Sequence, residues 1–252
     1  MPELPEVQTI VDALTKAGIN GRRITSVAVL WPKTIATSTP QKFCRLVHFK
    51  KIHTVRRRAK YIIFDLADGL YMAVHLRMTG RFELFPSKVC PSPHVRIVLD
   101  LNDGRRLMFH DTRKFGRFYI TNDLAAITRS LGPEPLSPKF TARVFAGKLK
   151  SRKRQVKPLL LDQSFISGLG NIYVDEALWA ARIHPQRLAN TLDGDEIKSL
   201  HRSIRHVLRQ GLRNAGTSLG RGLGNYSGLE KALGRNRAHL KVFQRTGEPC
   251  VR

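Results

Sequence analysis

The chain has 252 residues, a length that suits two medium-sized domains or one large one. Lys and Arg number 44 against 19 Asp and Glu, so the formal net charge is +25, and 42% of the residues are apolar. This balance excludes a disordered basic arm and favours a folded protein that binds a polyanion, with nucleic acid as the leading candidate. No apolar run approaches the roughly 18 residues of a membrane span, so no membrane partner is expected.

The first predicted element is an amphipathic helix over residues 5–17. Its apolar side chains fall at the helical spacing i, i+3, i+4 and i+7, and Gly18 is placed to end it. The hydrophobic period then changes to two. Eight short strands are predicted over residues 24–31, 45–49, 61–66, 71–76, 81–85, 95–101, 106–109 and 117–120. This half of the chain is therefore expected to form an eight-stranded β-sandwich or flattened barrel, with the first helix against it.

The strand pattern stops near residue 121, and the Pro-rich stretch 131–136 predicts a linker and a domain boundary. Helices are predicted at 141–149, with Thr141 as cap, at 158–162, from a cap at Asn171 to residue 181, and from a cap at Asp195 to about residue 213. A Gly-rich loop over 216–228 and a hairpin around 239–247 follow. The class is α+β, with a β-rich domain over 1–130, a helical domain over 131–237 and a C-terminal hairpin segment over 238–252.

Chemistry is concentrated at the start of the chain. Removal of Met1 before a small residue leaves Pro2 with a free secondary amine, and an α-amino group has a pKa near 8. Such an amine can attack an electrophilic carbon and form an iminium. Glu3 and Glu6 lie within one turn and are suited to move protons or to stabilise that cation. The alternative is structural, because Pro and acidic residues are also favoured in the first turn of a helix.

Three further features suit phosphate binding, and each has a structural alternative. The turn at 168–171 precedes a helix, so its backbone amides form an anion site or simply a corner between helices. Lys60 follows three arginines at the head of a strand, where it enters a groove or belongs to a solvated charge run. His75 contacts phosphate or is a satisfied histidine of the sheet.

Six motifs along the chain together resemble one family. They are Pro2-Glu-Leu-Pro-Glu-Val7, Arg57-Arg-Ala-Lys-Tyr61, His75-Leu-Arg-Met-Thr-Gly80, Asp111-Thr-Arg-Lys-Phe-Gly116, Leu131-Gly-Pro-Glu-Pro-Leu136 and Gly168-Leu-Gly-Asn-Ile-Tyr173. In this order they are similar to the formamidopyrimidine-DNA glycosylase (MutM) family. Each motif alone is weak, and the ordered set is specific. The resemblance favours the catalytic interpretation of Pro2 over the helix-opening one.

The resemblance implies a bifunctional glycosylase and AP lyase that removes oxidised purines, such as 8-oxoguanine and formamidopyrimidines, from double-stranded DNA by β,δ-elimination. It implies a sandwich followed by a helix-two-turn-helix domain. The implied catalytic residues are Pro2, which forms the Schiff base, the acid/base Glu3, and Glu6 and Lys60.

The resemblance also implies how DNA is held. Lys60, His75 and Asn171 are implied to grip phosphates beside the lesion. The residues implied to fill the space left by the flipped nucleotide are Met78, Arg113 and Phe115. Thr217 and Ser218 match the polar start of a lesion-recognition loop at about 216–228, whose remainder diverges from the family.

The chain departs from the family at three places. Ala59 replaces a usual glycine, and Phe243 replaces a usual tyrosine. Family members carry a four-cysteine zinc finger, but here Cys250 is the sole candidate ligand in that region, and Cys44 and Cys90 lie in the other domain. Structural zinc needs four ligands, so Zn²⁺ is not expected to bind this chain as given. We expect truncation after Arg252 or, less favoured, a naturally zincless protein.

Other functions remain open on the sequence. One is an oxidised-pyrimidine glycosylase of the endonuclease VIII branch, which usually has Gly at position 4, where this chain has Leu4. Another is a catalytically impaired DNA-binding relic. A generic RNA-binding protein explains the charge but not the ordered motifs. The expected state is a monomer in the bacterial cytoplasm, at the nucleoid, because three widely spaced cysteines indicate a reducing compartment.

Overall fold

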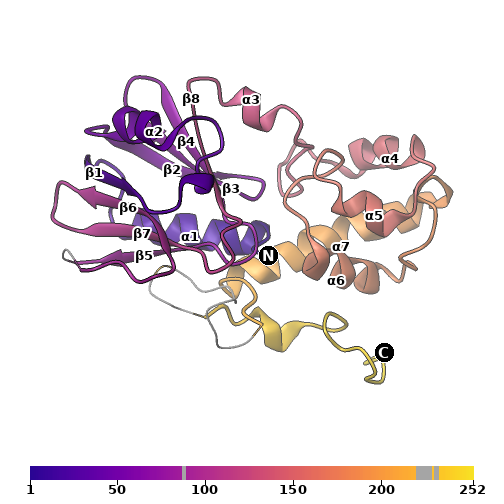
Figure 1. Cartoon of the computed structure of the whole chain (residues 1–252). Coiled ribbons are helices and arrows are strands. Elements are labelled where there is room, and N and C mark those ends of the chain that lie inside the picture. The colour runs from indigo at the N-terminus through magenta and orange to yellow at the C-terminus, as the bar shows by residue number, and fades with distance from the viewer. Residues whose placement is uncertain (87–88, 220–228, 230–232) are drawn as a thin grey trace.

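The computed structural model describes residues 1–86, 89–219, 229 and 233–252. Figure 1 shows two halves side by side, a sandwich of β-sheets and a group of helices. Helix α1 (Leu4–Lys16) lies along the sandwich, and its first residues reach the centre of the molecule beside α7 (Gly194–Arg213). The start of the chain is therefore placed at the junction of the two halves. Among the described residues, no helix has both the length and the apolar character needed to cross a membrane.

The sandwich consists of two four-stranded antiparallel sheets. The first contains, in spatial order, β1 (Ile24–Val29), β6 (Val95–Leu101), β7 (Arg106–His110) and β5 (Arg81–Phe85). The second contains β2 (Ile52–Arg58), β3 (Tyr61–Leu66), β4 (Leu70–His75) and β8 (Arg117–Thr121). Buried rings in edge-to-face contact form the centre of the core, namely Phe64, Phe82, Phe109 and Phe118. The α+β class and the eight-stranded sandwich are confirmed.

One predicted strand is wrong and one strand was missed. Residues 45–49 lie mostly in helix α2 (Pro40–Val47), which Thr39 caps by accepting a hydrogen bond from the Lys42 amide. Phe43 and Val47, four residues apart, bury the inner face of that helix. The missed strand is β2, in which consecutive basic residues mask the alternation. The two errors cancel in the strand count.

The helical half contains α3 (Ala125–Thr128), α4 (Ala142–Lys150), α5 (Val156–Leu161), α6 (Asn171–Ala181) and α7. Across the described residues of both halves there are three short 3₁₀ helices, η1 (Pro32–Thr34), η2 (Ala189–Thr191) and η3 (Asn236–His239). Thr141 caps α4 as predicted. The cap of α6 is Gly170 rather than Asn171, and the cap of α7 is Asp193 rather than Asp195, because Asp193 forms a capping box with Glu196.

Helix α6 ends at Ala181 and is followed by its C-cap Arg182, an exposed residue in the left-handed conformation with φ 59°. A side chain is unfavourable there and glycine is preferred. We expect Arg182→Gly to raise the free energy of unfolding by about 0.5–1 kcal/mol. The control is Arg202→Gly in the middle of α7, which is expected to lower it by about 1 kcal/mol. Urea denaturation of both variants is the measurement, and a loss of stability in both would contradict the prediction.

The hairpin predicted around 239–247 is wrong, since η3 and turns occupy residues 236–252 and no strand is present there. The reason lies in α6. The buried Glu176 carboxylate accepts hydrogen bonds from the backbone amides of Lys241, Val242 and Phe243 at 2.8, 2.9 and 2.9 Å. These amides are therefore not available to pair with a second strand.

An ionic contact joins the two halves. The Glu134 carboxylate, in the predicted linker, accepts hydrogen bonds from the Arg57 and Arg58 side chains, both at 3.0 Å, and from the Ala59 amide at 2.6 Å. Arg58 also donates to the carbonyl oxygen of Gly132 at 2.8 Å. These two arginines are thus fastened between the halves rather than solvated. Ala59 has φ 54°, a left-handed conformation that glycine adopts more easily, which explains why glycine is usual at this position in the family.

Candidate active site

The first turns of α1 and α6 share one carboxylate. Glu3 is only 2% exposed and accepts hydrogen bonds from the amides of Gly170, Ile172 and Tyr173 at 2.6, 2.9 and 3.4 Å. Amides at a helix N-terminus lack helical partners, and the helix dipole favours negative charge there. A Cβ atom at position 170 would lie 2.5 Å from Glu3 Cδ, so glycine is required. The turn at 168–171 binds an anion as predicted, but that anion is the chain's own Glu3.

Glu6 links the chain start to two other segments. One of its oxygens, Oε2, accepts the Glu3 amide at 2.8 Å. The other, Oε1, accepts the Tyr173 hydroxyl at 2.7 Å and the Thr217 amide at 2.8 Å. Asn236 donates to the Thr217 hydroxyl at 3.0 Å. The carboxylate therefore ties α1 to α6 and to the segment that follows α7.

The buried charges of this cluster shift each other's ionisation. Burial, opposed by the charge of Lys60, raises the pKa of the Glu3 carboxyl to about 7. Burial also raises the pKa of Glu6 and lowers the pKa of Lys60, which is 4% exposed in the turn between β2 and β3. The pKa of the Met1 α-amino group is lowered, again chiefly by burial. The cluster therefore contains a carboxyl that exchanges its proton near neutral pH, beside an amine that loses its proton readily.

The three expected phosphate contacts differ in their surroundings. His75 ends β4 and is buried, and burial with the charges of Arg77 and Lys60 lowers its pKa to about 3. Its Nδ1 accepts the Arg77 amide at 3.1 Å, so the neutral ring carries its proton on Nε2. Asn171 is exposed in the first turn of α6, and Lys60 is buried near Glu3. His75 is thus a neutral donor rather than a cation.

The three expected void-filling residues lie on two neighbouring loops. Met78, between β4 and β5, is 42% exposed, and Phe115, between β7 and β8, is 45% exposed. The guanidinium of the exposed Arg113 lies 4.8 Å from the centre of the Phe115 ring. The buried Asp111 carboxylate joins the loops, because it accepts the Thr79 hydroxyl and the Gly116 amide. The structure thus presents large side chains at the surface from a rigid base.

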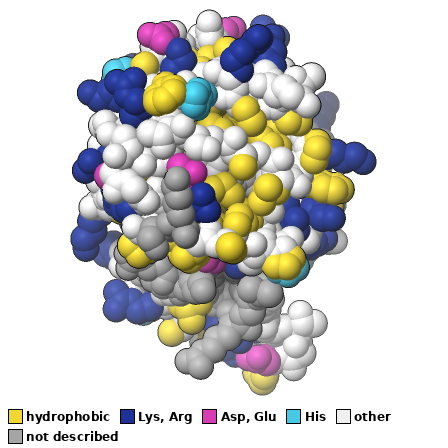
Figure 2. Space-filling model, turned by 60° about the vertical axis from the view of Figure 1, so that its left-hand side comes forward, with side chains coloured by type: hydrophobic (Ala, Val, Ile, Leu, Met, Phe, Trp, Pro, Cys, Tyr) yellow, Lys and Arg dark blue, Asp and Glu magenta, His cyan; other side chains and the backbone are white. Residues whose placement is uncertain are grey.

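The surface of the sandwich half suits a polyanion. Figure 2 shows Lys and Arg side chains spread around the edge of this face, with few acidic side chains and a group of hydrophobic side chains near its centre. Distributed basic charge of this kind attracts phosphate backbones without selecting a sequence.

Thr217 and Ser218 lie where the segment after α7 begins. Both are buried, and the Ser218 hydroxyl accepts the Gly234 amide at 2.9 Å. Thr217 forms an isolated bridge with Arg235. These contacts hold the two ends of the segment together. Of the predicted loop over 216–228, residues 220–228 lie outside the described residues.

In the described part of the chain the three cysteines do not form a metal site. Cys250 and Cys90 are exposed, and Cys44 lies half-buried in α2. Within the described residues, no three His, Cys, Asp or Glu side chains gather as metal ligands. Tetrahedral zinc requires four such ligands. The residues present therefore do not fit the zinc ion that the family resemblance implies.

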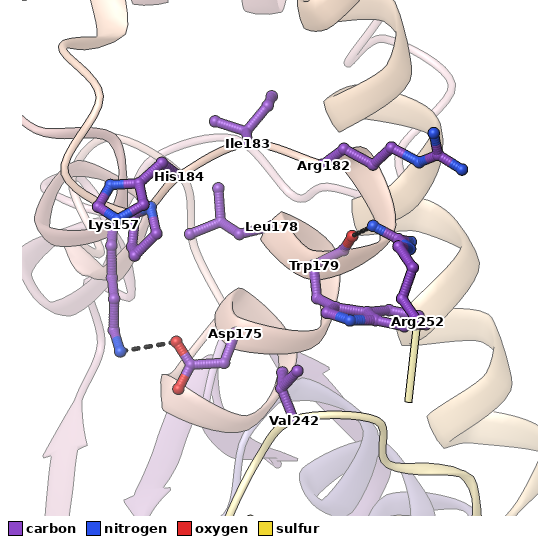
Figure 3. Close-up of a pocket in the computed structure, with 10 residues that line it drawn as sticks. Lys157, Asp175, Leu178, Trp179, Arg182, Ile183, His184, Val242 and Arg252 are labelled. Carbon is purple, nitrogen blue, oxygen red and sulfur yellow. Dashed lines mark hydrogen bonds and ion pairs between the residues drawn. The ribbon is translucent and has the colours of Figure 1, made fainter. Parts of the chain in front are cut away.

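A pocket of about 490 Å³ lies where the C-terminal segment crosses α6 (Figure 3). Asp175 on α6 pairs with Lys157 at 2.7 Å, and Arg252 stacks on the Trp179 ring at 4.2 Å. The Arg252 guanidinium also donates to the carbonyl oxygen of Trp179 at 3.0 Å. No residue predicted for catalysis or DNA binding lines this pocket. It is separate from the carboxylate cluster.

Three residues of the site were not singled out by their sequence. Tyr173, Asp111 and Glu134 were named only as members of motifs. Their polar atoms form long-range contacts, and sequence spacing carries little information about such contacts. A weak signal exists for Tyr173, since a hydroxyl on an apolar helix face requires a buried partner.

Two family models match the chain. Residues 1–118 match the formamidopyrimidine-DNA glycosylase N-terminal domain, and residues 131–221 match the H2TH domain of the same enzymes. The fold and the site therefore define a DNA-binding repair enzyme, a DNA glycosylase.

Curated relatives of the same family align with this chain over its full length. The chain is 49% identical to the formamidopyrimidine-DNA glycosylase of Protochlamydia amoebophila, over 100% of this chain and 91% of that protein. It is 42% identical to the enzyme of Herpetosiphon aurantiacus, over 100% and 92%. A Lactococcus lactis Fpg mutant bound to Fapy-dG-containing DNA superposes with a TM-score of 0.91 at 34% identity, over 100% and 91%. The chain belongs to the formamidopyrimidine-DNA glycosylase family.

Proposed function

We propose that the chain removes oxidised purines, such as 8-oxoguanine and formamidopyrimidines, from double-stranded DNA and then cuts the strand as an AP lyase. The observation that carries the proposal is the buried cluster of the chain start with Glu3, Glu6 and Lys60. The proposed substrates are supported by the Lactococcus lactis protein, which has been crystallised with Fapy-dG-containing DNA and with abasic-site DNA. The remaining steps follow from the chemistry of these groups.

In the proposed reaction the Pro2 nitrogen uses its lone pair to attack C1′ of the damaged nucleotide. The bond from C1′ to the base breaks, and the base leaves with its electron pair and takes up a proton. Protonated Glu3 gives its proton to the sugar ring oxygen as the ring opens, and the amine proton is lost as the C1′ iminium forms. The Glu3 carboxylate then takes a C2′ proton as the C3′–O bond to the 3′ phosphate breaks. In a second elimination, water takes the C4′ proton as the C5′–O bond to the 5′ phosphate breaks.

The proposed DNA contacts use the described positions. Lys60, the Nε2–H of neutral His75 and Asn171 are proposed to bind phosphates beside the lesion, which fixes register without selecting sequence. The residues proposed to occupy the stack and to pair with the orphaned base are Met78, Phe115 and Arg113. Flipping a nucleotide costs a few kcal/mol of unstacking, so rigidly held loops are an advantage.

We infer a monomer in the bacterial cytoplasm, at the nucleoid, with catalytic residues within 1–130 and a DNA-binding helical domain over 131–237. Thr217 and Ser218 are proposed to begin the lesion-recognition loop, at about 216–228. The proposed steps are assigned to the amine, the carboxyl, the DNA and water.

The rate of excision is expected to show a bell-shaped dependence on pH. The amine must be unprotonated, so the rate rises with pH until that group has lost its proton. Glu3 must be protonated, so the rate falls as pH rises through about 7, the raised pKa of this carboxyl. Single-turnover rates from about pH 5 to about pH 9 are the measurement. A rate that rises steadily through the alkaline range would contradict the role of Glu3.

Borohydride trapping tests the proposed function. The protein is mixed with duplex DNA that carries 8-oxoguanine opposite cytosine, and borohydride is added to reduce any iminium. A covalent adduct whose DNA is attached to Pro2, identified by mass spectrometry of the N-terminal peptide, is expected. Failure to trap both this duplex and an abasic-site duplex, with a folded protein, would overturn the proposal. Trapping on the abasic duplex alone would retain the lyase and remove the oxidised-purine assignment.

A further inference from the structure

Tyr173 places a hydroxyl group in the middle of the buried carboxylate cluster. Its side chain is 1% exposed and is among the largest fully buried side chains of the described residues. The hydroxyl donates to Glu6 at 2.7 Å and lies 3.3 Å from the Thr217 hydroxyl. It therefore contacts, at one point, the helix of the chain start and the segment after α7.

The neighbouring helix is shaped around this ring. Gly211 lies within α7, where a glycine costs about 1 kcal/mol relative to alanine. A Cβ atom at position 211 would lie 2.4 Å from the Tyr173 hydroxyl oxygen and 2.7 Å from the ring atom Cε1. Real contacts are not that short, so a side chain at 211 would displace the tyrosine. The space beside Tyr173 is thus provided at the expense of helix stability.

The hydroxyl acts on the chain start through Glu6. One oxygen of the Glu6 carboxylate accepts the Glu3 amide, and the other accepts both the Tyr173 hydroxyl and the Thr217 amide. A carboxylate held at both oxygens has one orientation, and that orientation fixes the backbone next to Pro2. Displacement of a reacting group by about 1 Å can lower a rate about a hundredfold.

We propose that Tyr173 is a positioning residue that holds Glu6, and through it the chain start, in the orientation needed for attack on the sugar. The inference rests on the proposed function, because it assigns Pro2 as the nucleophile. It goes beyond that function by assigning a role to a buried side chain that takes no part in the proposed chemical steps.

The positioning role of Tyr173 can also be tested through the ionisation of Glu6, which depends on the groups around it. Glu3 and the terminal amine approach from α1, Lys60 from the turn between β2 and β3, and Tyr173 from α6. Tyr173 also lines a cavity of about 10 Å³ together with Glu176 and His239. Burial raises the pKa of Glu6, and the bond from Tyr173 opposes that rise. Loss of the hydroxyl therefore favours protonated Glu6, so a change in the pH profile of Tyr173→Phe is a second readout of this contact.

Tyr173→Phe removes the hydroxyl and keeps the ring. Expected results are a fall of about tenfold or more in the single-turnover excision rate and in the rate of borohydride-trappable adduct formation. The dissociation constant for a duplex with an uncleavable tetrahydrofuran site is expected to stay within about twofold of wild type. Tyr71→Phe, a half-buried tyrosine of β4, is the matched control and is expected to change neither rate.

The outcomes distinguish failure of the positioning role of Tyr173 from failure of the proposed function. Excision by Tyr173→Phe within about twofold of wild type, with an unchanged pH profile, would overturn the positioning role. A rate loss that matches a loss of folded protein would also overturn it. Gly211→Ala, which displaces the ring, is expected to slow the reaction similarly. Absence of a trapped adduct in the wild-type protein would instead overturn the proposed function itself.

Discussion

Glu3→Gln is expected to reduce base excision to the background rate while leaving a folded protein. The amide keeps the shape of the side chain but has no proton to give to the sugar ring oxygen. General acid–base groups contribute typically 10²–10⁴-fold, so a loss of about that size is predicted. Pro2→Gly is expected to abolish excision as well, because the secondary amine is lost. Single-turnover cleavage of duplex DNA carrying 8-oxoguanine is the measurement.

The matched control for Glu3→Gln is Asp12→Asn. Asp12 is an exposed acidic residue on the same helix, and its carboxylate accepts a hydrogen bond from Gln8 at 2.8 Å. Its substitution removes one negative charge from α1 without touching the cluster, so excision should stay at the wild-type rate. Undiminished excision by both Glu3→Gln and Pro2→Gly would contradict the proposed catalytic centre.

Glu134→Ala is expected to lower the free energy of unfolding by about 2–4 kcal/mol. The substitution removes the shared acceptor of Arg57, Arg58 and the Ala59 amide, and the Arg57 side chain is only 11% exposed. A half-buried guanidinium left without its counter-charge carries a large desolvation cost. Urea denaturation followed by tryptophan fluorescence is the measurement.

A surface ion pair gives the comparison for Glu134. Glu248 pairs with Arg245 at 3.0 Å, and its side chain is 54% exposed. Exposed pairs contribute about 0–1 kcal/mol, so Glu248→Ala should have little effect. Equal effects of the two substitutions would mean that the contact between the halves adds nothing beyond a surface pair.

Periodicity predicted the parts of the fold that rest on local pattern. The strands at 61–66, 81–85 and 95–101 match β3, β5 and β6 residue for residue, because their apolar residues and flanking turns are unambiguous. Residues 40–58 were misassigned, since α2 is short and β2 carries its charges into the contact between the halves. The hairpin at 239–247 failed because Glu176, more than sixty residues away in sequence, occupies its backbone donors.

The candidate site shows the same division. The proposed nucleophile and its two acidic neighbours were predicted from a seven-residue stretch, and Lys60 and His75 from short motifs. The anion bound at 168–171 was misidentified, because nothing local indicates that Glu3 reaches the start of α6. Tyr173, whose hydroxyl meets Glu6 over 167 positions of sequence, could be found only from the folded chain.

The hydrogen bonds from the amides of Gly170 and Ile172 make the position of the Glu3 carboxylate depend on both halves of the molecule. The acid is contributed by one half of the molecule, and the amides that hold it are contributed by the other. Neither half alone contains the complete proposed cluster, so activity is expected to require contact between the two halves. Conditions that part the halves, such as mild denaturant, should extinguish activity before either half loses its own core.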